Sequence, residues 1–168
     1  MAEAFNTLVL TGDKAARYAA VAEEIASVLD AEPNIVARMA TVASMLAATF
    51  DDYFWTGFYV VDPDPRPNGP RELVVGPYQG TLGCLRIAFG RGVCGTAAAT
   101  GQTQVVADVH AFPGHIACDS RSASEIVVPV FDATGALVAV FDVDSERPAA
   151  FDATDAEWLE RILKQVFA

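Results

Sequence analysis

Basic residues are scarce in this sequence. Eleven lysines and arginines stand against 22 aspartates and glutamates in 168 residues, and the formal net charge is −11. A nucleic-acid-binding protein needs a basic face to neutralise phosphates, so this charge balance argues against that class of function. Most of the acidic charge serves solubility, although an acidic protein could also attract a cationic ligand.

Long apolar stretches are absent as well. No run reaches the ~20 apolar residues of a membrane-spanning helix, so we expect no membrane partner. Residues Met1–Asn6 lack the basic start and apolar block of a secretory signal, which favours a cytoplasmic protein. Repeats, linkers and low-complexity segments are also missing. The length, with 52% hydrophobic residues, predicts one globular domain over residues 1–168.

Cysteine and histidine are rare but gathered in one segment. All three cysteines and both histidines lie between residues 80 and 125: Cys84, Cys94, His110, His115 and Cys118. An odd cysteine count in a reducing compartment favours thiol chemistry or buried packing over a disulfide framework. Zinc sites usually contain C-x2–4-C pairs, and none is present, so we expect no metal site.

The order of the expected elements is typical of an α+β fold. Apolar residues at helical spacing predict helices over 11–29, from Pro33 to about Phe50, and after a capping box formed by Thr154 and Glu157. A short helix is expected at 96–99, a long loop at 110–123, and strands at 54–61, 72–78, 82–88, 103–109, 125–131 and 137–145. We expect a mostly antiparallel sheet with the terminal helices on one face and the loop-rich, cysteine-bearing segment on the other.

The sequence leaves open which cysteine is the reactive one. An isolated cysteine is usually an inert, buried hydrophobe, but three within 35 residues weaken that interpretation. Cys94 lies near a helix start, where the helix dipole lowers a thiol pKa. Cys118 lies in the long loop, with Asp119 expected to raise its pKa and Arg121 to lower it. Local charge therefore favours Cys94, and loop position favours Cys118.

Three carboxylates are expected close together at the last two strands. Strand alternation places Asp142 and Asp144 on the face of Val138 and Val140, about 7 Å apart along the strand. Glu125 begins the neighbouring strand. Such a cluster is repulsive unless a cation, such as a ligand ammonium, lies between the acids. A solvated strand end is the alternative, and the spacing alone favours it at least as strongly.

Aromatic residues are concentrated in the first two expected strands. Trp55, Phe58, Tyr59 and Tyr78 are most simply read as core residues. They become candidates for a ligand pocket only if Trp55 lies on the same sheet face as Asp142.

Several short motifs of this chain occur together in one known family. They lie at residues 55–59, 76–80, 84–87, 90–95, 106–110, 112–120, 124–129 and 142–145. With these motifs, nearly the whole chain resembles the free methionine-(R)-sulfoxide reductases, which are single GAF domains. GAF domains mostly serve as sensors, so the specificity of the resemblance rests on the three cysteines in register and the Asp-x-Asp pair. The resemblance implies a GAF-like α+β fold with a loop-covered ligand site.

The resemblance also implies a catalytic cycle. Free methionine R-sulfoxide would be reduced by Cys118 as nucleophile, while Glu125 protonates the departing oxygen. The resulting sulfenic acid would condense with Cys84, with Cys94 as an auxiliary thiol. Thioredoxin would reduce the disulfide, and no bound cofactor or metal is expected.

The resemblance assigns the substrate contacts to the acids and aromatics described above. Asp142, Asp144 and Glu125 would hold the ammonium of the substrate, Trp55 would pack against its methyl end, and Tyr59 would join the pocket. Two other functions are possible for such a fold: a non-catalytic GAF sensor of a small molecule, and a redox sensor. A sensor normally carries an output domain, and we expect none after Ala168. By analogy, a homodimer formed through the terminal helices is plausible.

Overall fold

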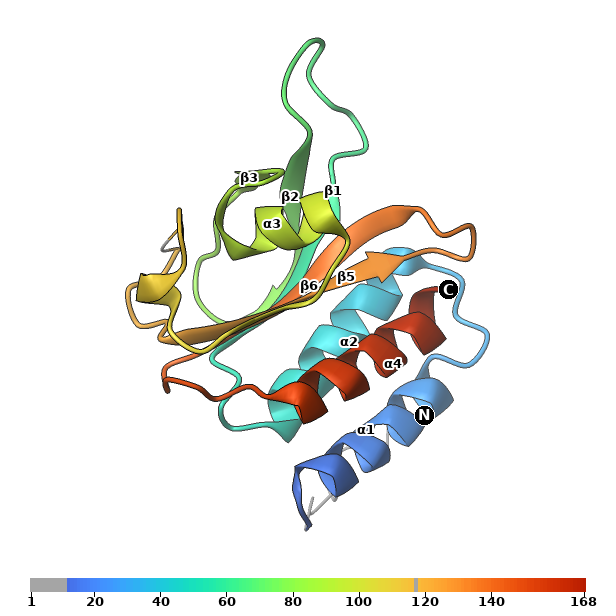
Figure 1. The fold of residues 1–168 in the computed structure, drawn as a ribbon. Helices are drawn as coiled ribbons and strands as arrows, with labels where there is room; N and C mark the ends of the chain where they lie inside the picture. Colours follow the sequence, from blue (N-terminus) through green and yellow to red (C-terminus); the bar gives the residue numbers. More distant parts are fainter. Residues whose placement is uncertain (1–11, 117) are drawn as a thin grey trace.

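The computed structural model describes residues 12–116 and 118–168 (Figure 1). The predicted helix start at Thr11 and the segment Met1–Asn6 lie outside the described residues. The core of the structure is a six-stranded antiparallel sheet in the order β3-β2-β1-β6-β5-β4. Its strands are β1 (Trp55–Val61), β2 (Glu72–Gln79), β3 (Arg86–Ala88), β4 (Gln104–Val106), β5 (Ser124–Phe131) and β6 (Leu137–Ser145). This arrangement confirms the predicted α+β fold.

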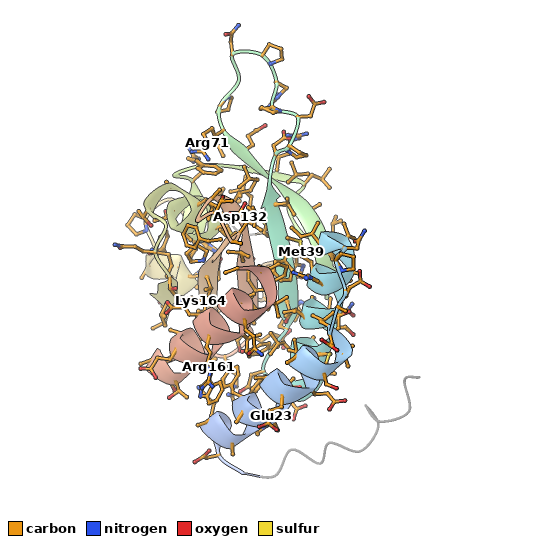
Figure 2. The ribbon with its side chains drawn as sticks, turned by 90° about the vertical axis from the view of Figure 1, so that its right-hand side faces the viewer. Glu23, Met39, Arg71, Asp132, Arg161 and Lys164 are labelled. Atoms are coloured by element: carbon orange, nitrogen blue, oxygen red, sulfur yellow. A yellow bond between two sulfur atoms is a disulfide. The ribbon has the colours of Figure 1, made fainter. Side chains whose placement is uncertain are left out.

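Three helices lie on one side of the sheet. The helices α2 (Ile35–Thr49) and α4 (Ala153–Phe167) pack on β1, β2 and β5, and α1 (Lys14–Val28) packs on these two helices (Figure 1). Met39 of α2 is one of the fully buried side chains of this layer (Figure 2). The loop at 62–70 extends away from the body of the molecule (Figures 1 and 2). The terminal helices therefore cover one face, as predicted.

Two helix starts differ from the prediction because other side chains cap them. Asn34 accepts hydrogen bonds from two backbone amides of the first turn of α2, so that helix begins one residue after the N-cap Asn34 rather than at Pro33. The capping box of α4 is formed by Asp152 and Asp155, not by Thr154 and Glu157. The Asp152 carboxylate accepts a hydrogen bond from the backbone amide of Thr154, so Asp152 takes the N-cap position predicted for Thr154.

The other face is covered by α3 (Gly92–Thr100) and the segments around it (Figure 1). This helix begins at Gly92, four residues before the predicted start, and Cys94 therefore lies in its first turn. The flanking strands are shorter than predicted, and Val109–Ala111 forms a 3-10 helix at the predicted end of one of them. The described residues contain no helix long and apolar enough to cross a membrane.

The alternation predicted for β6 holds over most of the strand. Ala139, Phe141 and Val143 belong to the core under the helices, whereas Val140 belongs to the second apolar cluster on the other face. The prediction fails at the start of the strand, where Val138 packs toward the helices. The pairing of β5 with β6 shifts by one residue there, and the irregularity reverses the faces of the side chains that precede it.

Candidate functional site

The central strands bring the predicted site residues to the face opposite the helices. In the antiparallel ladders Asp144 is the partner of both Trp55 and Glu125, and Asp142 is the partner of Gly57. Directly paired residues of antiparallel strands point to the same face. Trp55 therefore lies on the same face as Asp142, which was the condition for assigning the aromatics to a pocket.

A pocket of about 30 Å³ lies between this face, the start of α3 and the two cysteine-bearing loops. Its lining includes all but one of the residues predicted for the site: Trp55, Tyr59, Cys94, Cys118, Glu125, Asp142 and Asp144. The exception is Cys84, which follows the lining residue Gly83. Phe58, the remaining aromatic residue of β1, does not line the pocket, because it lies in the core under the helices.

The acidic cluster is buried rather than solvated. Glu125 is 6% exposed and Asp142 is 4% exposed, which overturns the alternative of a solvated strand end. Burial, followed by the neighbouring carboxylates, raises the pKa of Glu125 well above its ordinary range. Burial and Asp144 likewise raise the pKa of Asp142. Among the described residues, Asp142 Oδ1 has no hydrogen-bond partner.

Asp144 is the least perturbed of the three acids. Burial raises its pKa to about 6, while a hydrogen bond with Ser122 acts in the opposite direction. At neutral pH the cluster therefore has to retain protons or accept a cation. An ammonium group would satisfy both the charge and the unpaired oxygen of Asp142.

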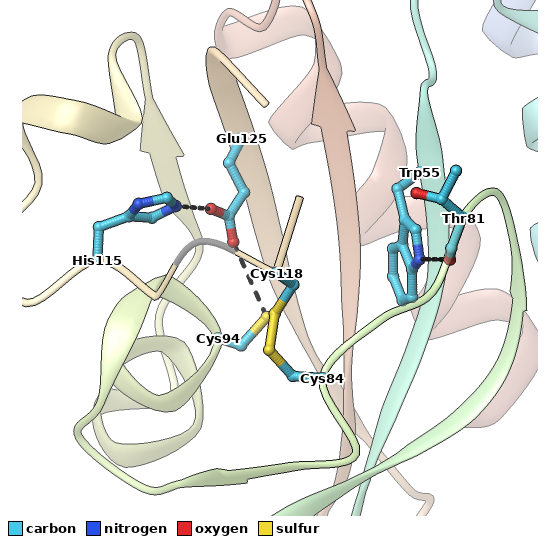
Figure 3. Close-up of a disulfide and its surroundings, with 7 residues drawn as sticks. All are labelled: Trp55, Thr81, Cys84, Cys94, His115, Cys118 and Glu125. Carbon is cyan, nitrogen blue, oxygen red and sulfur yellow. Dashed lines mark hydrogen bonds and ion pairs between the residues drawn. A yellow bond between two sulfur atoms is a disulfide. The ribbon is translucent and has the colours of Figure 1, made fainter. Parts of the chain in front are cut away.

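Cys94 faces the acids from the first turn of α3. Its Sγ lies 3.9 Å from Glu125 Oε1 (Figure 3). Burial, and then the charges of Asp142 and Glu125, raise the pKa of this thiol well above its ordinary value. The prediction that local charge makes Cys94 the thiolate is therefore wrong, because burial and the facing carboxylates outweigh a helix dipole worth about 0.3–1 kcal/mol.

Cys84 and Cys118 are joined by a disulfide, with their Cα atoms 5.5 Å apart (Figure 3). Cys118 is exposed in its loop, and Cys84 is half-buried. A second connection lies beside the disulfide: Thr81 Oγ1 donates a hydrogen bond to Asp119 Oδ2 at 2.9 Å. The two cysteine-bearing loops thus meet above the acidic cluster.

An aromatic stack forms the wall of the pocket on β1. The ring of Trp55 lies 5.4 Å from that of Tyr59 and 5.0 Å from that of Tyr78, nearly parallel to both. Its Nε1 donates to the carbonyl of Thr81 at 3.0 Å (Figure 3). Gly57 makes room for this stack, because a Cβ there would lie 2.2 Å from Cβ of Tyr78.

His115 is a member of the site that the sequence did not indicate. Its Nε2 lies 3.8 Å from Glu125 Oε2, and its side chain is 13% exposed (Figure 3). Burial, followed by the charge of His110, lowers the pKa of His115, so the ring is neutral at physiological pH. Only its place in the motif at 112–120 marked it, because the loop shows no periodicity from which a side-chain direction could be inferred.

Known proteins resemble this chain over most of its length. The GAF domain family matches residues 34–166. The chain is 40% identical over 141 residues to the free methionine-R-sulfoxide reductase of Saccharomyces cerevisiae, covering 82% of this chain and 76% of the relative. It is 38% identical over 149 residues to the enzyme of the same name from Escherichia coli, covering 89% and 86%.

A solved structure is similar as well. The X-ray structure of free methionine-R-sulfoxide reductase from Neisseria meningitidis, in complex with its substrate, has 49% sequence identity and a TM-score of 0.85. The match covers 93% of this chain and 89% of that chain. The fold is therefore the GAF fold that the motifs implied.

Proposed function

Since the chain belongs to the free methionine-R-sulfoxide reductases, a family of GAF-domain enzymes, we propose that it reduces the R-sulfoxide of free methionine to methionine. The observation that carries the proposal is the buried acidic cluster directly below the Cys84–Cys118 pair. One side of this pocket suits an ammonium group, and the other carries a redox-active pair of sulfurs. A free amino acid with an oxidised sulfur presents both groups.

In the first step, the Cys118 thiolate attacks the sulfoxide sulfur while protonated Glu125 gives its proton to the oxygen. A bond between the Cys118 sulfur and the substrate sulfur forms, and the sulfur–oxygen bond breaks to release hydroxide. The hydroxide then attacks the Cys118 sulfur, the sulfur–sulfur bond breaks, methionine leaves as the thioether, and Cys118 becomes a sulfenic acid. The substrate sulfur gains two electrons and Cys118 loses two. The raised pKa of Glu125 supports this role, because burial and the neighbouring carboxylates favour the protonated form that can donate.

In the second step, the Cys84 thiol attacks the Cys118 sulfur, forming the disulfide and releasing water. The bond between these two cysteines supports this pairing over one with the more deeply buried Cys94. A reduced thioredoxin then exchanges its dithiol for the disulfide and restores both thiols. Exposure of Cys118 supports access by such an external reductant.

Substrate selectivity is assigned to the acids and the aromatic stack. Glu125, Asp142 and Asp144 bind the substrate ammonium, which supplies the missing partner of the buried Asp142 oxygen. Trp55 and Tyr59 pack against the methylthio end. No bound cofactor is used. We also propose that residues 1–168 act as one cytoplasmic domain that can form a homodimer through its terminal helices.

The test is a coupled assay in which thioredoxin and its reductase consume NADPH. Free methionine R-sulfoxide should sustain NADPH consumption, and the S epimer should not. Heat-denatured enzyme is the control for direct reduction by thioredoxin. If the native enzyme reduces neither epimer while its disulfide is still reduced by thioredoxin, the chain is a sensor and the enzymatic proposal fails.

A further inference from the structure

We propose that the pocket is also a zinc site, in which Cys94, Glu125 and Asp142 bind one Zn²⁺ ion in the absence of substrate. The binding of zinc does not depend on the proposed function. A single consequence, competition between zinc and the sulfoxide, rests on it.

The geometry brings three donor groups to one point. One ligand atom each from Cys94, Glu125 and Asp142 lies within 4.8 Å of the other two, and all three residues are buried. They come from α3, β5 and β6, so the sheet ladders and the packing of the helix hold them in place. Rigid elements position ligands more accurately than loops do.

A separate observation indicates that this cluster lacks a partner. Asp142 is 4% exposed, and its Oδ1 has no hydrogen-bond partner among the described residues. Buried polar atoms are nearly always satisfied, and a bound ion is one of the ways in which such an unsatisfied carboxylate oxygen acquires a partner. The cavity of about 30 Å³ is large enough for one ion.

The donor types select the metal. One thiolate and two carboxylates match the sulfur and oxygen ligands of Zn²⁺, which bind at about 2.3 and 2.0–2.2 Å. Mg²⁺ and Ca²⁺ require six or more oxygen ligands and do not favour sulfur. Three protein ligands leave one tetrahedral position open toward the pocket, as in zinc sites that exchange a small ligand.

His115 lies beside one of the three ligands without being a ligand itself. Its Nε2 lies 3.8 Å from Oε2 of Glu125, whereas Cys94 approaches Oε1 of the same group. The three ligands are spread between residues 94 and 142, so no closely spaced pair of cysteines marks the site in the sequence.

Zinc should compete with the substrate for the same carboxylates. An ion held by Glu125 and Asp142 occupies the position proposed for the ammonium group. In reduced enzyme, micromolar Zn²⁺ should therefore raise the apparent KM for the R-sulfoxide, and EDTA should restore it.

The binding test uses the oxidised protein. With the Cys84–Cys118 disulfide intact, Cys94 is the one cysteine with a free thiol, so adventitious binding to a dithiol is avoided. Calorimetric titration with zinc chloride should give one ion per chain, and millimolar Mg²⁺ should not displace it. Cys94→Ser and Asp142→Asn should each weaken binding by at least about 10–100-fold. Glu146→Gln, which changes a 53% exposed carboxylate, is the matched control and should bind zinc normally.

Cobalt supplies a readout that does not require activity. Co²⁺ bound to the wild type should show the charge-transfer absorption of a thiolate ligand, and Cys94→Ala should lose it while keeping its circular dichroism spectrum. Absence of stoichiometric zinc binding, or undiminished affinity in the Cys94 variants, would overturn the site. Zinc binding without sulfoxide reduction would leave the site intact and refute the proposed function instead.

Discussion

At the scale of single residues, the main feature of the pocket is its cluster of three carboxylates. Glu125, Asp142 and Asp144 lie within one network, and burial raises the pKa of each. Placing them there costs stability whenever they must ionise without a cation. The cost is acceptable where a ligand compensates for it, and stability is commonly lost in this way at binding sites.

Asp144→Asn should make the ligand-free protein more stable at neutral pH. The pKa of Asp144 rises from 3.8 to about 6 on folding, so the folded state binds more protons and loses stability as pH rises through about 6. Relative to wild type, the variant should gain up to about 3 kcal/mol of unfolding free energy between pH 4 and pH 7.5. Urea unfolding of the oxidised wild type and variant at pH 4 and pH 7.5 measures this difference in unfolding free energy.

Glu146→Gln, at an exposed carboxylate, is the control and should show no such pH-dependent gain. A stability difference between wild type and Asp144→Asn that is the same at both pH values would contradict the raised pKa. The raised pKa would also be contradicted if the unfolding free energy of the variant minus that of wild type were lower at pH 7.5 than at pH 4.

Two cysteine variants should separate the chemical step from recycling. Cys118→Ser should form no methionine in a single turnover with excess enzyme, because a hydroxyl is a far weaker nucleophile than a thiolate. Cys84→Ser should form about one equivalent and then turn over slowly, because the sulfenic acid lacks its partner. One equivalent from Cys118→Ser would transfer the nucleophilic role to Cys94. Full thioredoxin-dependent turnover of Cys84→Ser would remove Cys84 from recycling.

At the scale of elements, β1 combines the aromatic wall of the pocket with a residue that has no side chain, Gly57. Gly57 lies opposite both Asp142 and Tyr78, and only the lack of a side chain allows Tyr78 to cross it toward Trp55. The neighbouring Phe58 points into the helix-side core. One strand thus supplies packing to one face and the pocket wall to the other.

Gly57→Ala should damage the pocket and destabilise the fold. The added Cβ would lie 2.2 Å from Cβ of Tyr78 and 2.9 Å from the carbonyl oxygen of Pro77, so the backbone of β2 must move. Overpacking of this kind costs about 1–3 kcal/mol. Thermal unfolding should show the loss, and KM should rise because the Trp55 stack is displaced. Unchanged stability and KM would show that the strand pair accommodates the methyl group.

The two cysteine-bearing loops behave as a pair joined at two points. Thr81→Val removes the hydrogen bond to Asp119 and leaves the cysteines in place. The first equivalent of methionine should form at the wild-type rate, and closure of the disulfide should slow by about three- to tenfold, given an exposed bond to a charged group. Trapping of the sulfenic acid with a dimedone probe measures its lifetime. Thr103→Val removes a similar exposed bond to Glu160 and should not change that lifetime. Equal lifetimes in wild type and Thr81→Val would show that the disulfide alone joins the loops.

At the scale of the whole molecule, sequence periodicity predicted the layers better than the loops. Alternation along β6 placed Asp142 and Asp144 on one face, and the sheet order then brought Trp55 and Glu125 to them. The direction of His115 could not be predicted, because loop side chains follow no period. The pKa of Cys94 was misjudged because the acids that raise it lie 31 or more residues further along the chain.

The division of the molecule into two faces also explains its proposed specificity. The helix side is a continuous apolar core, whereas the pocket side combines acids, thiols and aromatics around a small cavity. A peptide-bound sulfoxide lacks the free ammonium, and its chain would have to pass beneath the two joined loops. Selection for a free amino acid therefore follows from charge and enclosure together.

Comparison of kcat/KM for free and N-acetylated methionine R-sulfoxide tests the ammonium site most directly. A hydrogen bond to a charged group is worth about 1.5–3 kcal/mol, so acetylation should lower kcat/KM of the wild type by at least about tenfold to a hundredfold. Asp142→Asn should lose a similar factor on the free substrate and much less on the acetylated one. Equal kcat/KM values for both substrates in the wild type would contradict recognition of the ammonium by Glu125, Asp142 and Asp144.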